Sequence, residues 1–404
     1  MSEWKEVKLQ NVVSKLGDGL HGTPKYDDNG EYYFINGNNL DNGKITIKDS
    51  TKKTSIEEYK KYKKDLNNRT ILVSINGTLG NIGLYNNEKC FLGKSACYFN
   101  VKENVEKLFI KYVVTNNHFQ EHINVFANGT TIKNVSLKTM REYPFFLPPL
   151  HEQKVIAEVL SSLDDKIDLL HRQNKTLEQM AETLFRQWFV EEVQEDWKVI
   201  KIGDYLDVLL GGTPSTKNKD YWNGNIPWVN SGEINKFRIL EPTKYITQLG
   251  LDNSSTKLLP KGTTVLAITG ATLGQVSRLE IDACANQSVI GIIGSEEFTN
   301  EYIYLWIKHY IKDIISNQTG GAQQHINRND VKNTTIIKPD EVTYEKFMNL
   351  IKPIFDKISK NSFQIRTLEQ MRDTLLPKLM RGEIRVKYGK GEKIFAPTDK
   401  KEIL

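Results

Sequence analysis

The sequence predicts an α/β protein of the α+β kind, in which two similar mixed α/β globular domains are separated by two long helices that form an antiparallel coiled coil. Three observations predict this fold: an internal repeat, the same order of short strands and one helix in each half, and a heptad pattern after each half. The expected divisions are a first globule at 1–147, a central helix at 148–191, a second globule at 192–338, a distal helix at 339–381 and a tail at 382–404.

The repeat is visible within the chain itself. The string Thr-Leu-Glu-Gln-Met begins at Thr176 and again at Thr367, an offset of 191 residues. A Trp-Lys pair at Trp4 recurs at Trp197, so the agreement reaches the start of both halves. Because 404 residues are too many for one ordinary core, a duplication is the natural division of this chain.

Each half is expected to contain the same elements in the same order. Runs at 70–75 and 263–268 are rich in β-branched residues and are followed by turn-forming residues, as strands are. Apolar residues near helical spacing then predict one helix from Leu108 and another from Glu301. Each half finally returns to extended structure before a proline opens a long helix.

The two long helices carry a heptad pattern. From Ile156 onward, small or apolar residues alternate steps of four and three, and the only strongly polar residue in this seam is Asn174. The corresponding seam 191 residues later is interrupted by Asn361 and Arg372. Since a buried asparagine is costly alone and tolerable in a pair, we expect Asn174 to face Asn361 in an antiparallel register.

This register assigns definite partners. Fourteen residues after Asn174 and fourteen before Asn361, it places Trp188 opposite Phe347. Pro353 is the weak point of the distal helix, because a proline removes one helical hydrogen bond and can kink the helix. The simpler alternative is a pair of amphipathic helices that pack on separate domains, which the repeat and the matched asparagines disfavour.

Composition excludes several classes of protein. No apolar stretch approaches the length of a membrane span, and the start, Met-Ser-Glu-Trp-Lys-Glu-Val, lacks the apolar core of a secretory signal. Three scattered cysteines are too few for a disulfide framework or a zinc cluster, so we expect a cytoplasmic protein. A net charge of +5 permits a polyanionic partner without requiring one.

Several strings resemble the specificity subunits of type I restriction-modification systems, and the resemblance covers nearly the whole chain. They are Gly-Thr-Pro at 22–24 and 212–214, and Leu-Pro-Pro-Leu-His-Glu-Gln at 147–153 followed by Leu-Asp-x-Lys-Ile at 163–167. The second copy departs from the pattern, because Lys338 is followed by Pro-Asp-Glu with no Glu-Gln pair.

The resemblance implies that each globule is a target recognition domain that binds half of a bipartite double-stranded DNA sequence. It implies two modification (methyltransferase) subunits docked on the helices, and it leaves open whether a restriction (translocase and endonuclease) subunit also joins. The chain itself would be non-catalytic and would bind no cofactor, with S-adenosylmethionine and ATP on the partner subunits. It would thereby direct adenine methylation or cleavage by those partners.

Base recognition requires donor and acceptor side chains on loops that can enter a groove. The candidates in the first half are Thr23, Lys25, Asn36, Asn38, Asn76, Thr78, Lys94, Ser95, Thr130 and Lys133. Those in the second half are Thr213, Ser215, Lys217, Asn230, Ser231, Thr269, Thr272, Gln287, Gln323, Gln324, His325, Asn327 and Arg328. The stretch from Gln318 to His325 ranks first, because glutamine pairs with adenine. The same residue types dominate turns and caps, so we expect about a third of the candidates to touch DNA.

The segment 44–64 carries eight lysines and fewer acids. Such a segment would neutralise phosphates and make binding sensitive to salt, or it is only a solvated loop.

Catalytic motifs are incomplete. Pro148-Pro149 lacks the flanking residues of an amino-methyltransferase motif, and no glycine opens a phosphate loop before Gly93-Lys94-Ser95. His118 and His122 lie four residues apart, but no third metal ligand accompanies them, so a surface or capping role is expected. A non-catalytic scaffold with duplicated protein-binding domains therefore remains the alternative to a DNA-recognition subunit.

Overall fold

The structure is a computed structural model that describes residues 4–129, 131–316, 325–389 and 392–397. It divides into two units: unit 1 comprises residues 1–166 and 368–404, and unit 2 comprises residues 167–367. Each unit therefore contains one globule together with a segment of both long helices. Among the residues described, no helix combines the length and apolar character that crossing a membrane requires.

Unit 1 contains four sheets in the described residues that precede the first long helix. Its strands are β1 (Lys5–Lys8), β2 (Val13–Asp18), β3 (Tyr32–Ile35), β4 (Leu40–Asp41), β5 (Lys44–Ile45), β6 (Lys53–Thr54), β7 (Thr70–Ser74), β8 (Ile82–Leu84), β9 (Cys90–Leu92), β10 (Ala96–Val101) and β11 (Pro144–Leu147). Its helices are α1 (Leu9–Val12), η1 (Gly37–Asn39), α2 (Ile56–Tyr62), α3 (Lys107–Thr115), α4 (Asn117–Val125) and α5 (Leu137–Glu142). The main sheet is antiparallel with the order β2-β10-β7-β8, the second has the order β6-β3-β9, and β1 pairs with β11. The short strands β4 and β5 form an additional ladder.

In its described residues, unit 2 repeats three of these four sheets. Its strands are β12 (Lys198–Lys201), β13 (Asp207–Leu210), β14 (Trp222–Val229), β15 (Lys244–Ile246), β16 (Thr264–Ala267), β17 (Val276–Arg278), β18 (Cys284–Ala285), β19 (Val289–Ile293) and β20 (Thr335–Lys338). Its helices are α7 (Ile202–Tyr205), η3 (Lys219–Tyr221), η4 (Ser231–Asn235), α8 (Gln248–Asp252), η5 (Gly270–Thr272), α9 (Asn300–Ser316) and α10 (Arg328–Asn333). The orders β13-β19-β16-β17, β15-β14-β18 and β12-β20 match those of unit 1, including one parallel pair in the second sheet of each.

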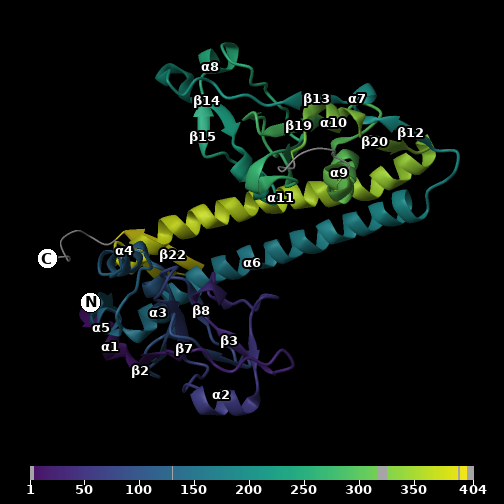
Figure 1. Cartoon of the computed structure of the whole chain (residues 1–404). Helices are drawn as coiled ribbons and strands as arrows, with labels where there is room; N and C mark the ends of the chain where they lie inside the picture. The colour runs from purple at the N-terminus through teal and green to yellow at the C-terminus, as the bar shows by residue number, and fades with distance from the viewer. Residues whose placement is uncertain (1–3, 130, 317–324, 390–391, 398–404) are drawn as a thin grey trace. The chain divides into compact units, whose positions relative to one another are not determined.

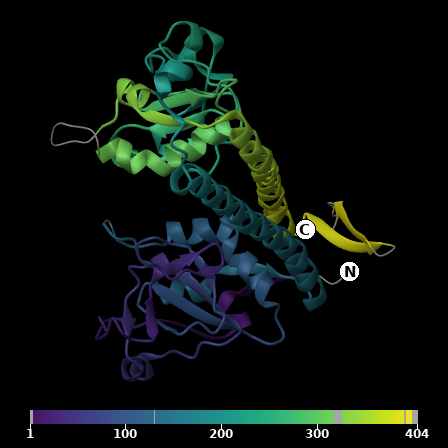
Figure 2. The ribbon, with the colours of Figure 1, turned by 90° about the vertical axis from the view of Figure 1, so that its right-hand side faces the viewer.

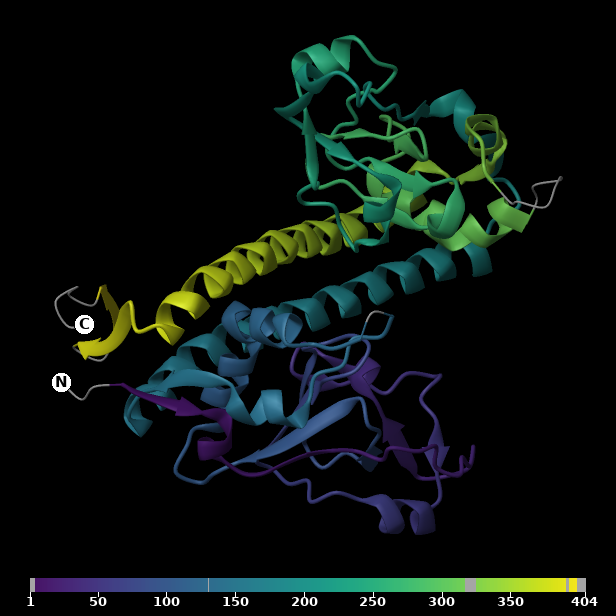
Figure 3. The same ribbon diagram turned by 60° about the vertical axis from the view of Figure 1, so that its left-hand side comes forward.

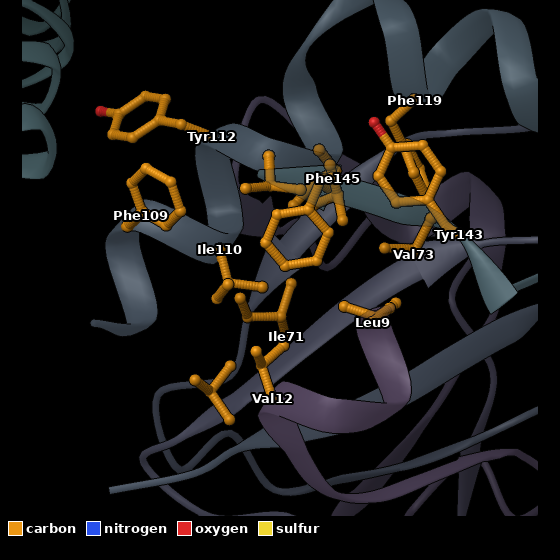
Figure 4. Packing of buried hydrophobic residues seen from close by; sticks show 14 of the residues in the cluster. Leu9, Val12, Ile71, Val73, Phe109, Ile110, Tyr112, Phe119, Tyr143 and Phe145 are labelled. Atoms are coloured by element: carbon orange, nitrogen blue, oxygen red, sulfur yellow. The ribbon is translucent and has the colours of Figure 1, made fainter. Parts of the chain in front are cut away.

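The core of each unit joins the main sheet to helices on one of its faces. In unit 1, Ile71 and Val73 of β7 pack with Phe109 of α3 and Tyr143, as Figure 4 shows. The same core includes Leu160 from the first long helix. In unit 2, α9 packs between the sheet and the helix pair, and Figure 1 shows it beside α11. Burial of these apolar faces is the main force that holds each globule on its helices.

The helical region from Leu108 is two helices, where the sequence pattern predicts one. Asn116 ends α3 and begins α4, with φ −63° and ψ 143°, and its side chain accepts a hydrogen bond from the backbone N–H of His118. Asparagine is a favoured N-cap because its side chain satisfies a free N–H of the first turn. The counterpart in unit 2, α9, is continuous over 17 residues.

The two long helices are α6 (Leu150–Arg186) and α11 (Glu341–Met380). A π-helical turn, η2 (Gln187–Glu191), continues α6. Within unit 2 their segments run antiparallel, as Figure 3 shows, with the Trp188 and Phe347 rings 5.8 Å apart. The helix α11 is continuous through Pro353, since buried Ile351 and Phe355 pack on either side of it and only one N–H is lost.

Asn174 and Asn361 are in direct contact in this helix pair. Asn361 Nδ2 donates to Asn174 Oδ1 at 2.9 Å, and Asn174 Nδ2 donates to Ser362 Oγ at 3.2 Å. Both asparagines are buried, with 3% and 0% of their surface exposed. These are the two residues that the heptad register places opposite each other, and together with the Trp188–Phe347 contact they define an antiparallel pair of helix segments.

The tail beyond α11 contains a hairpin of β21 (Ile384–Gly389) and β22 (Glu392–Pro397), drawn in yellow in Figure 2. Ile384 and Val386 pack against the core of unit 1. The sequence patterns did not predict these strands.

Candidate nucleic-acid interface

Five loops of unit 1 are joined at one end of its sheets. We call their described residues the unit 1 loops: 19–25, 36–38, 75–80, 93–95, and 128–129 with 131–135. Backbone hydrogen bonds link them: Lys94 N to Leu20 O at 2.9 Å, Gly93 N to Ile35 O at 2.8 Å, Ile75 N to Ser95 O at 2.9 Å and Val135 N to Ile75 O at 2.8 Å. Because these bonds are made by the backbone, the loop framework does not depend on which side chains the loops carry.

The unit 2 loops are joined by the same network. They are 211–217, 230–233, 268–274, 285–288 and 325–328, with bonds from Gly212 N to Ala285 O at 2.8 Å, Asn286 N to Val229 O at 3.0 Å, Ile268 N to Ser288 O at 3.0 Å and Ile326 N to Ile268 O at 3.2 Å. Three of the four bonds join equivalent positions of the repeat in both units. The duplication therefore preserves a loop framework as well as a fold.

The candidates in the first half divide into exposed and supporting residues. Thr23, Lys25, Asn38, Thr78, Lys94 and Lys133 are exposed, Asn36, Asn76 and Ser95 are half-buried, and Thr130 lies outside the described residues. Ser95 Oγ donates to Asn36 Oδ1 at 2.8 Å and accepts from Gly37 N at 2.9 Å. Asn76 Nδ2 donates to Asn134 Oδ1 at 3.2 Å. These three half-buried side chains hold loops together.

The candidates in the second half divide in the same way. Ser215, Lys217, Thr269, Gln287, His325, Asn327 and Arg328 are exposed, Thr213, Asn230, Ser231 and Thr272 are half-buried, and Gln323 and Gln324 lie outside the described residues. Asn327 caps α10, and Arg328 Nε donates to Val208 O at 2.7 Å. Thr213 Oγ1 donates to the Gln287 side chain, which joins two of the loops. Of the stretch from Gln318 to His325, only His325 is described.

The lysine-rich segment folds onto the unit 1 loops. Asn39 Nδ2 donates to Thr46 O at 3.0 Å and to Thr51 Oγ1 at 2.9 Å. Lys48 Nζ donates to Asn38 O at 2.6 Å. The exposed Lys48 and Lys52 therefore lie in a segment that is anchored beside the exposed Asn38, whereas the exposed lysines 60, 61 and 63 lie in α2 or directly after it. Such charges suit a polyanion.

His21 is a further polar residue in these loops that sequence patterns did not select. Its side chain is 72% exposed, and Nε2 lies 2.7 Å from Asp18 Oδ2. Its place directly before the repeated Gly-Thr-Pro is the signal that could have found it.

The repeated tryptophans Trp4 and Trp197 have a structural role. Trp4 Nε1 donates to Glu152 Oε2 at 3.0 Å, and the equivalent Trp197 Nε1 donates to Asp340 Oδ2 at 3.2 Å. In both units an indole at the start of the globule is fixed to an acid at the start of a long helix. The Pro-Asp-Glu sequence after β20 thus supplies the acid from Asp340, whereas the first copy supplies it from Glu152.

Gln153, the last residue of the Leu-Pro-Pro-Leu-His-Glu-Gln string, also has a structural role. Its side chain accepts from Glu106 N at 2.9 Å and donates to Pro148 O at 2.7 Å. In unit 2 the equivalent position is Tyr344, whose hydroxyl accepts from Thr299 N at 2.7 Å. A tyrosine therefore replaces the missing glutamine and keeps one of its two contacts.

The residues that resemble catalytic or metal-binding motifs occupy other structural settings than those motifs require. Gly93-Lys94-Ser95 connects β9 to β10 and does not precede a helix, as a phosphate loop would. His118 Nδ1 lies 2.8 Å from Tyr143 Oη, and burial lowers the pKa of His122. In the described part of the chain, no three His, Cys, Asp or Glu side chains gather as a metal site.

Comparison with known proteins places these features in one family. The family profile described as the type I restriction modification DNA specificity domain matches residues 1–179 and 194–367. The chain is 27% identical over 387 residues to the type I restriction enzyme MjaIX specificity subunit of Methanocaldococcus jannaschii, covering 90% of this chain and 86% of the relative. It is 24% identical over 357 residues to the HindI specificity subunit of Haemophilus influenzae, covering 68% and 77%.

A solved structure has the same fold. The crystal structure of the type I restriction-modification S subunit from M. genitalium superposes with a TM-score of 0.62 and 19% identity, covering 94% of this chain and 96% of that one. Since the family profile matches both halves and most of the length, this chain belongs to the type I restriction-modification DNA specificity family.

Proposed function

We propose that the chain is the sequence-specific DNA-binding subunit of a type I restriction-modification complex, in which each unit binds one half of a bipartite target. The observation that carries this proposal is the shared loop framework with different side chains. At equivalent positions of the two frameworks, Lys94 corresponds to Gln287 and Asn76 to Thr269. One scaffold that presents different donors and acceptors is what two different half-sites require.

The remaining parts of the complex follow from the same proposal. Two modification subunits dock on the long helices and bring S-adenosylmethionine, and a restriction subunit that uses ATP joins the complex when cleavage occurs. This chain contributes no catalytic residue and binds no cofactor. Its role is to hold the partners over adenines of the DNA sequence that its loops select.

Mapping methylated adenines in host DNA tests the proposal directly. With the gene present, methylation is expected at one bipartite motif, and without it that motif is expected to be unmethylated. Exchange of residues 1–147 for another recognition domain is expected to change one half of the motif only. A change in both halves would contradict the modular assignment.

Salt dependence separates DNA recognition from the scaffold alternative. If the loops bind phosphates through lysines, the affinity for duplex DNA falls steeply with salt concentration. A scaffold that binds only proteins would show no DNA affinity to lose, and that result would reject the proposal.

A further inference from the structure

A buried cluster of charges joins the second globule to α6. Glu178 of α6 accepts hydrogen bonds from Arg238 Nη2 at 2.8 Å, Tyr304 Oη at 2.6 Å and Lys308 Nζ at 2.6 Å. Arg238 is only 3% exposed and Glu178 only 5%. Tyr304 and Lys308 belong to α9, whereas Arg238 belongs to the loop after η4, so three parts of unit 2 meet at one carboxylate.

The cluster continues to α11. Arg238 Nε lies 3.6 Å from Glu280 Oε1, and Arg278 Nη1 donates to the same oxygen at 3.0 Å. Ser359 Oγ of α11 donates to Glu280 Oε2 at 2.7 Å. The guanidinium groups of Arg238 and Arg278 each lie 5.5 Å from the ring centre of Phe355, also on α11. Both long helices are therefore bonded to the globule through this cluster.

Such a cluster fixes the relative orientation of the elements it joins more than it increases the free energy of unfolding. Burial raises the pKa of Glu178, but Arg238 and Lys308 outweigh it and hold that pKa below its ordinary value. Apolar residues of equal volume often stabilise a protein as well as a buried ion pair does. A guanidinium fork, however, fixes the angle at which two elements meet, which an apolar contact does not.

The elements fixed by the cluster carry the unit 2 loops. Lys236 precedes Arg238 by two residues, and its ammonium lies 3.1 Å from Glu233, which forms a capping box with Asn230. From Tyr304 in the cluster, α9 continues to Ser316, and His325 is the next described residue along the chain. A rotation of the globule about the cluster would move these loops relative to the helices of unit 2.

We propose that Glu178 and Arg238 are positioning residues that fix the orientation of the unit 2 loops on their helix segment, and so determine how strictly the spacing between the two half-sites is enforced. This inference rests on the proposed function. One additional base pair moves a half-site by about 3.4 Å and turns it by about 35°. If the globule is held firmly, the DNA must deform to bring the displaced half-site to the loops. If the globule is loosened, it can rotate toward the half-site, and the DNA deforms less.

The experiment maps methylated adenines in cells that carry the complete complex with wild-type or variant chain. Glu178→Gln removes the central charge, and Glu182→Gln is the matched control. Glu182 lies one turn away on α6 and bonds Lys308 Nζ at 2.7 Å, and no described contact joins it to Arg238. Glu178→Gln leaves the buried Arg238 charge with less negative charge beside it, which can impair folding. The double variant Glu178→Gln with Arg238→Met therefore removes both charges. Arg238→Lys is the conservative variant.

For the Glu178→Gln and double variants, both half-site sequences are expected to stay the same. Methylation at sites whose spacer is one base pair shorter or longer is expected to rise roughly tenfold, since relief of a modest DNA deformation is worth that much. Arg238→Lys should show a smaller rise and Glu182→Gln none.

An unchanged distribution of spacers in the folded variants would overturn the inference, as would an equal rise in Glu182→Gln. Failure of the proposed function is distinguished by the wild-type map, which would then show no bipartite motif that depends on this gene.

Discussion

Asn361 donates its side-chain amide to Asn174 Oδ1 at 2.9 Å inside the seam between α6 and α11. Each asparagine comes from a different helix, and each would leave a buried amide unpaired if the helices slipped by one turn. The penalty for an unpaired amide makes this pair a determinant of register, even though it adds little to stability.

Replacement of one asparagine is expected to cost more than replacement of both. Asn361→Leu leaves the buried Asn174 Oδ1 without its donor and is expected to lower the free energy of unfolding by about 1–3 kcal/mol. The double variant Asn174→Leu with Asn361→Leu should recover most of this loss, because no unpaired amide remains. Denaturant titration measures both, and a double variant as unstable as the single one would contradict the role of the pair.

The indole contacts at the helix starts are expected to contribute in both units. Trp197→Phe removes the donor to Asp340 and should cost about 1 kcal/mol, as should Trp4→Phe, which removes the donor to Glu152. A double-mutant cycle of Trp197→Phe with Asp340→Ala isolates the hydrogen bond from the lost packing. A coupling energy near zero would show that the contact has no energetic weight.

Lys94 tests the contribution of the unit 1 loops to DNA binding. Its exposed ammonium forms no side-chain hydrogen bond within the described residues, so it is available for a phosphate. Lys94→Ala is expected to weaken DNA binding and to reduce the slope of log affinity against log salt by about 1. Lys5→Ala on β1 is the matched control, because Lys5 carries the same charge and is also exposed in the same unit. Equal effects of the two variants would argue against a contact at Lys94.

Acid should remove the stabilisation that Glu178 supplies. Its pKa in the folded protein is held below the ordinary value of 4.5, so its contribution is complete above pH 4.5 and is lost as the pH falls through the lower, folded value. The stability difference between wild type and Glu178→Gln is therefore expected to shrink below pH 4.5. Thermal unfolding at a series of pH values measures this difference, with Glu182→Gln as a control. A difference that grows in acid would contradict the assigned direction.

Much of the helix pair could be predicted from the sequence, because heptads record burial directly. The seam from Ile156 contains one strongly polar position, and its antiparallel partner follows from the second asparagine. The break at Asn116 was missed because apolar spacing continues across it, and only the backbone angles of the cap reveal two helices. The correspondence between Gln153 and Tyr344 was missed because the two residue types differ, although the side-chain oxygen of each accepts a hydrogen bond from an equivalent backbone N–H.

The candidate residues show the limit of local patterns. Sequence identifies Asn36, Ser95 and Asn327 as polar loop residues, but it cannot distinguish a side chain that supports a loop from one that faces solvent. Here Ser95 bonds Asn36, and Asn327 caps α10. Lys94 and Asn38, by contrast, are exposed. Hydrogen-bond partners distant in sequence decide this, and no single segment encodes them.

The sequence by itself determined the duplication, the two long helices and their register, since repeats and heptads are one-dimensional records of a fold. Only the tertiary structure decided which loops share a framework, and which charges meet at Glu178. Arg238 lies 60 residues from Glu178 and Tyr304 lies 126 residues from it. A buried charge needs partners in space, and only folding of the globule onto the helices brings those partners to it.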